Sequence, residues 1–160
     1  MTHIADEARM RGTIVSDVTD PEGRNAAAFA HALAARLGLR VVLAFVVDGP
    51  VAGARESVTG RQRQHGASST LTAIASELGD GVETRLVAGD RVEALARIAA
   101  EEGADLVIVG ARAVGLGGRN LRCRFLRDLE AETAVPVLVA PPSTRRRSEQ
   151  RLAVGIATSS

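Results

Sequence analysis

Short runs of apolar and β-branched residues alternate along the chain with longer stretches rich in alanine, leucine, glutamate and arginine. Short apolar runs are typical of buried strands, whereas the longer stretches carry apolar residues at helical spacing. The alternation predicts an α/β fold: a Rossmann-like, doubly wound, five-stranded parallel sheet with helices on both faces. The strands are predicted at residues 13–16, 40–47, 82–87, 105–110 and 135–140.

Residues that favour helix ends mark the helix after the first strand. Asp20 is followed by Pro21, which predicts a helix with Asp20 as its N-cap and proline in the first helical position. The helix is expected to run to Leu37 and to end at Gly38, because glycine readily adopts the left-handed conformation that closes a helix.

The sequence signals for the later helices differ in strength. Residues 48–66 have no apolar periodicity and are expected to form a loop before a helix at residues 69–78. Asp90 and Glu93 form a capping box that predicts the start of a third helix. A fourth helix is expected to include Leu129.

The composition describes one globular domain and excludes several functions. The 160 residues are 46% hydrophobic and 24% charged, and 20 basic residues against 19 acidic ones give a net charge of +1. With only 2% aromatic residues, the chain is not expected to bind nucleic acid. Every basic residue is arginine, which excludes a Walker-type phosphate loop and a lysine nucleophile.

Metal, membrane and catalytic signals are absent from the sequence. Cys123 is the single cysteine, and the three histidines have no metal-ligand spacing, so no metal site is expected. No apolar run approaches the ~20 residues that span a bilayer, and the first residues do not resemble a signal peptide. We therefore expect a cytoplasmic protein without membrane contact. No nucleophile–base motif is present, and an enzyme is not expected.

Three segments together resemble the universal stress protein family. They are residues 89–95 (GDRVEAL), 103–112 (GADLVIVGAR) and 135–141 (VPVLVAP). The resemblance implies a universal stress protein domain over residues 11–141, after an N-terminal extension at residues 1–10. Residues 142–160 are then an arginine-rich linker and a strand-like C-terminal tail.

In nucleotide-binding members of that family, a loop of pattern Gly-x2-Gly-x9-Gly-Ser/Thr follows the fourth strand and wraps the phosphates. Carried over by position, this pattern falls on Gly110, Ala113, Cys123 and Arg124, and only Gly110 matches. Glycines let backbone N–H groups approach phosphate oxygens, so the departures are expected to weaken binding by about two to four decades.

Two further family positions are intact. The resemblance implies that the first-strand aspartate that holds the nucleoside is Asp17, and that the second-strand backbone contact to the base is at Val46. Arginines surround the altered loop and either bind an anion through their side chains or form a solvated helix face; they are Arg112, Arg119, Arg122, Arg124 and Arg127.

The resemblance implies weak or degenerate binding of ATP or another adenine nucleotide, with a regulatory role in a stress response. The alternative is a dimeric scaffold or protein-interaction module that binds no nucleotide. The fifth strand is the last unit and is expected at a sheet edge, where members of the family dimerise. We therefore expect a homodimer through this edge, with an unidentified protein partner as a further possibility.

Overall fold

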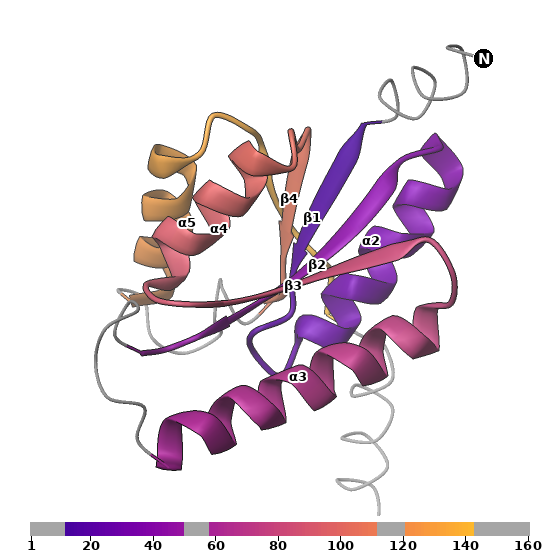
Figure 1. Ribbon diagram of the computed structural model, residues 1–160. Helices are drawn as coiled ribbons and strands as arrows, with labels where there is room; N and C mark the ends of the chain where they lie inside the picture. Colours follow the sequence, from indigo (N-terminus) through magenta and orange to yellow (C-terminus); the bar gives the residue numbers. More distant parts are fainter. Residues whose placement is uncertain (1–11, 50–57, 112–120, 143–160) are drawn as a thin grey trace, which may run out of the picture.

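The computed structural model describes residues 12–49, 58–111 and 121–142 (Figure 1). Its strands form one parallel sheet in the order β3-β2-β1-β4-β5. The elements are β1 (Thr13–Asp17), α2 (Gly23–Leu37), β2 (Arg40–Val47), α3 (Val58–Leu78), β3 (Val82–Ala88), α4 (Arg91–Glu101), β4 (Leu106–Val109), α5 (Leu121–Glu132) and β5 (Val137–Val139). The predicted fold class is confirmed, and β5 lies at a sheet edge as expected.

Alternate residues of the central strand serve two cores on opposite faces of the sheet. Ile14 belongs to the core under α2 and α3, whereas Val15 belongs to the core under α4 and α5. Figure 1 shows these two helix pairs on opposite sides of the sheet. Alanines form most of the buried side of α2, which allows the helix to lie close to the sheet; they are Ala26, Ala27, Ala30 and Ala34.

The prediction of a loop over residues 48–66 is wrong in its second half, because α3 begins at Val58. Residues 60–66 are all exposed, and Ala67 is the first buried residue of α3 among those whose burial the structure describes. Apolar periodicity detects only a helix face that packs on the core. These first turns therefore left no periodic signal.

The start of α2 also differs from the prediction. The N-cap is Glu22 rather than Asp20, and its side chain makes no capping hydrogen bond. Asp20 instead forms a turn before the helix: its Oδ1 accepts a hydrogen bond from the Glu22 N–H at 2.9 Å, and its carbonyl accepts one from Gly23 at 2.8 Å. Two other predicted helix boundaries are confirmed, and both depend on a capping residue next to the helix. Gly38 closes α2 at φ 68°, and the Asp90 side chain caps α4.

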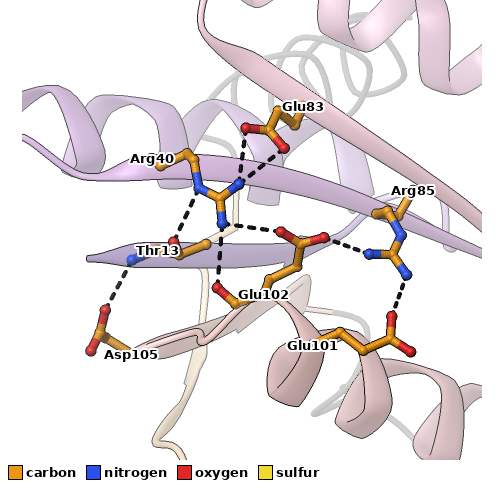
Figure 2. Close-up of polar contacts among 7 residues, drawn as sticks. All are labelled: Thr13, Arg40, Glu83, Arg85, Glu101, Glu102 and Asp105. Carbon is orange, nitrogen blue, oxygen red and sulfur yellow. Dashed lines mark hydrogen bonds and ion pairs between the residues drawn. The ribbon is translucent and has the colours of Figure 1, made fainter. Parts of the chain in front are cut away.

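Charged residues tie the amino ends of the strands to the end of α4 (Figure 2). Arg40, which begins β2, donates from Nη1 to both Glu83 oxygens at 2.9 and 3.0 Å. Its Nη2 donates to Glu102 Oε2 at 3.0 Å, and its Nε donates to Thr13 Oγ1 at 3.2 Å. One guanidinium on β2 therefore joins β1, β3 and the end of α4. We call Thr13, Arg40, Glu83, Arg85, Glu101 and Glu102 the amino-end network.

Glu102 is the most enclosed acid of this network, with 13% of its side chain exposed. It lies between Arg40 and Arg85, and Arg85 also contacts Glu101. Hydrogen bonds with Glu83 raise the pKa of Arg40, and hydrogen bonds with Glu101 and Glu102 raise the pKa of Arg85. Because both values are raised, a rising pH does not begin to remove the arginine contribution to stability until it passes the ordinary arginine pKa.

Glu102→Gln is expected to lower the free energy of unfolding by about 1–2 kcal/mol, because the neutral amide leaves two arginines without their shared charge. Urea denaturation measures the change. Glu77→Gln is the matched control, since Glu77 forms an exposed pair with Arg24 and should contribute less than about 1 kcal/mol. Equal effects of the two substitutions would contradict a structural role for the amino-end network.

Candidate functional site

The sequence-predicted residues gather at the carboxyl ends of the central strands. β1 and β4 are neighbours in the sheet, and the chain continues from them in opposite directions, to β2 and to β5. Such a switch point is where open α/β sheets bind ligands. Asp17 ends β1, Gly110 directly follows β4, and Val46 lies one residue before the end of β2. These three residues therefore lie together where the carboxyl ends of the strands meet.

The Asp17 carboxylate is fully buried and is held by groups of its own chain. Its Oδ1 accepts a hydrogen bond from the Thr19 N–H at 3.0 Å. Its Oδ2 accepts two hydrogen bonds from Arg91, one from Nε at 2.8 Å and one from Nη2. No part of the Asp17 side chain is exposed. The carboxylate expected to hold a nucleoside thus already has three donors.

Arg91 is the first residue of α4 and contacts three side chains. Besides Asp17, its Nη2 donates to Asp20 Oδ2 at 3.0 Å. Its guanidinium carbon lies 4.5 Å from the centroid of the Phe125 ring, within the range of a cation–π contact. Burial lowers the pKa of Arg91, but the charges and hydrogen bonds of Asp17 and Asp20 outweigh burial and raise it. The guanidinium therefore keeps its charge.

The backbone of Val46 is also engaged. Its N–H donates to Thr19 Oγ1 at 3.0 Å. The preceding bond between these strands runs from the Val18 N–H to the Ala44 carbonyl at 2.9 Å, so the threonine hydroxyl extends the ladder by one step. Thr19 thus contacts both expected nucleoside-binding positions: its N–H binds Asp17 and its hydroxyl binds Val46.

Gly110 lies against the turn that precedes α2. A Cβ atom at this position would lie 2.9 Å from Glu22 Cβ and 3.2 Å from Asp20 Oδ1. Real Cβ atoms do not approach at the first of these distances. The turn from β1 to α2 packs directly on the end of β4, and this packing requires glycine at position 110.

The altered phosphate loop is described only in part. Arg112 and Ala113 lie outside the described residues. The backbone of Cys123 lies in the first turn of α5, and its side chain lies outside the described part of the structure. Arg124 is exposed and pairs with Asp128 at 3.6 Å, one helical turn further on. At Arg124 the geometry is that of a solvated helix face.

The family model described as the universal stress protein family matches residues 10–141. The chain belongs to the universal stress protein family. No curated protein matches it in sequence.

Solved structures share the universal stress protein fold at low sequence identity. A universal stress protein from Burkholderia pseudomallei is 24% identical, with a TM-score of 0.64, over 84% of this chain and 98% of that one. A universal stress protein in complex with cAMP is 20% identical, with a TM-score of 0.60, over 82% and 98% of the two chains. One from Archaeoglobus fulgidus in complex with dAMP is 19% identical, with a TM-score of 0.59 and the same coverage.

Sequence reasoning missed Arg91 and Thr19 in this universal stress protein domain. A local signal existed for Arg91, because a cation in the first turn of a helix opposes the helix dipole. The capping box predicts residue 91 in the first turn of the helix, and an arginine at this unfavourable position indicates a nearby acid that stabilises it. Thr19 gave no comparable signal, since a threonine after a strand is common in turns.

Within residues 12–49, 58–111 and 121–142, no group of three or more histidine, cysteine, aspartate or glutamate side chains could hold a metal ion. In the same ranges no helix has the length and apolar character needed to cross a membrane.

Gly110→Ala is expected to lower the free energy of unfolding by about 1–3 kcal/mol, because the added methyl group meets the turn at Glu22. Urea denaturation measures this. Gly49→Ala is the matched control: a Cβ there has nothing within 4 Å, so the change should stay within about 0.5 kcal/mol. A Gly110→Ala protein as stable as the control would show that the turn moves aside freely.

Proposed function

We propose that this universal stress protein domain binds an adenine nucleotide weakly at the carboxyl ends of β1, β2 and β4, and that it has a regulatory role in a stress response. Two observations support this ligand class. Proteins of the same fold are in complex with cAMP and with dAMP. Asp17 and Val46, the positions that the family resemblance assigns to the nucleoside, lie at one edge of the sheet beside the switch point.

We propose weak binding because both nucleoside positions are already engaged in hydrogen bonds within the protein. Asp17 accepts hydrogen bonds from Arg91 and Thr19, and the Val46 N–H donates to Thr19. A nucleoside that used these groups would exchange protein hydrogen bonds for its own. Only the difference between the two sets would appear in the binding free energy.

We propose a binding role rather than a catalytic one. Asp17 and Asp20, two acids beside the switch point, both accept hydrogen bonds from Arg91. A general base needs a free acceptor within reach of a substrate proton, and these carboxylates are directed at a permanent cation. The charged guanidinium cannot itself accept a proton.

Calorimetric titration with ATP is expected to give a dissociation constant of about 0.1–1 mM. Asp17→Asn should abolish detectable binding, because the charge that orders the site is lost. Asp80→Asn is the matched control, since Asp80 is exposed in the turn before β3, far from the carboxyl ends. A dissociation constant of about 1 µM or lower would contradict weak binding. No saturable binding by any of the three proteins would favour the scaffold that binds no nucleotide.

We also propose that the domain forms a homodimer through the free edge of β5. β5 pairs only with β4 among the described strands, and Leu138 leaves 38% of its surface exposed on this edge. An apolar edge strand pairs readily with a second copy of itself. A two-fold axis beside β5 would bring the two copies of Leu138 close together.

Leu138→Lys is expected to convert the dimer to a monomer, because the substitution places like charges on both sides of the axis. Light scattering at tens of micromolar protein measures the mass. Leu37→Lys is the control, since Leu37 is the other large exposed apolar side chain of the described residues, at 61%, and lies at the end of α2. It should remain a dimer. A monomeric wild-type protein would refute the edge pairing.

A further inference from the structure

We propose that Arg91 is a built-in competitor for the nucleoside-binding carboxylate: its guanidinium occupies Asp17, and its displacement limits how tightly an adenine nucleoside binds. This inference rests on the proposed function. It attributes the weak binding of the nucleoside to Arg91 of α4, whereas the sequence alone attributes weak binding to the altered phosphate loop.

The hydrogen bonds and the burial of Asp17 together leave no access for a ribose. A carboxylate offers about four acceptor positions on its two oxygens. Arg91 uses two on Oδ2 and the Thr19 N–H uses one on Oδ1. The side chain is fully buried, so no exposed side of the carboxylate remains. The two hydroxyl groups of a ribose can reach Asp17 only where the guanidinium has left.

Arg91 has another place in which its charge is satisfied. Asp20 accepts a hydrogen bond from the same guanidinium at 3.0 Å, and the Phe125 ring lies 4.5 Å from the guanidinium carbon. Because 26% of the Arg91 side chain is exposed, water also reaches it. When the guanidinium leaves Asp17, these groups keep it paired. The exchange is therefore costly enough to weaken binding without forbidding it.

The competition also specifies the ligand chemistry. A ligand takes the place of Arg91 at Asp17 only if it brings hydrogen-bond donors, as the ribose diol of adenosine does. 2′,3′-Dideoxyadenosine lacks both of these hydroxyls, so it has no ribose diol to donate to Asp17. Removing Arg91 should strengthen the binding of adenosine and leave the binding of the dideoxy compound unchanged.

The experiment compares the wild type, Arg91→Met and Arg91→Lys by calorimetric titration with adenosine and with 2′,3′-dideoxyadenosine. Arg91→Met should bind adenosine at least tenfold more tightly than the wild type, a change of about 1.4 kcal/mol. Arg91→Lys should lie between them, because lysine lacks the two-pronged contact. Arg97→Met is the matched control: Arg97 lies on the same helix in an exposed pair with Glu101 and should match the wild type.

The outcomes separate this inference from the proposed function. If the wild type binds adenosine and Arg91→Met binds no more tightly, the inference fails and the proposed function stands. An equal gain for the dideoxy compound would also overturn it, because the gain would not come from Asp17. If no protein binds adenosine, both fail. Should Arg91→Met not fold by circular dichroism, Arg91→Lys decides, and an affinity equal to the wild type overturns the inference.

Discussion

A carboxylate removed from water at the end of a central strand needs a partner of opposite charge, and the site is arranged around how Asp17 meets this need. The partner comes from 74 residues further along the chain, at the first position of α4. Because Arg91 also contacts Asp20 and Phe125, one guanidinium joins β1, the turn before α2, and α5. Removing one partner of a buried pair typically costs about 3–5 kcal/mol, because the other charge is left buried and unpaired.

Arginine serves both ends of the sheet, in two different environments. At the amino ends, Arg40 donates hydrogen bonds from all three of its nitrogens, two of them to acids that are partly open to water and the third to the Thr13 hydroxyl. At the carboxyl ends, Arg91 faces a carboxylate with no exposed surface. The planar fork suits both positions, since it can donate to several oxygens at once. The amino-end network holds strands and a helix end together, whereas the Arg91–Asp17 pair lies at the switch point of the sheet.

The parts of the fold that depend on local chemistry could be predicted from the sequence. The glycine that closes α2 and the aspartate that caps α4 act within one helical turn, and both predictions are confirmed. The start of α3 was missed because its first turns face solvent and carry no apolar period. Asp20 was misassigned because its carboxylate serves the turn and Arg91, and the second of these contacts joins distant parts of the chain.

In the site, too, some features could be predicted from the sequence, whereas contacts between distant residues could not. Asp17, Val46 and Gly110 lie at or beside the carboxyl ends of parallel strands, and this follows from the parallel α/β fold that the alternating pattern predicts. Their partners do not follow from it, because a contact between residues 17 and 91 depends on how α4 packs across the sheet.

Ligand binding at a site that already satisfies its own polar groups is an exchange, and its free energy is a difference between two sets of similar bonds. Family membership determines the fold and the places of Asp17 and Val46 in it. It does not determine whether the hydrogen bonds within the protein or those to a ligand are more favourable. In this chain the internal partners of those groups are a permanent cation and a hydroxyl group, each within hydrogen-bond distance. A domain of this kind gains little stability from a ligand unless the ligand concentration exceeds the dissociation constant. Under the proposed function, its occupancy follows the nucleotide concentration, which is the behaviour that a regulatory domain requires and a permanently loaded one lacks.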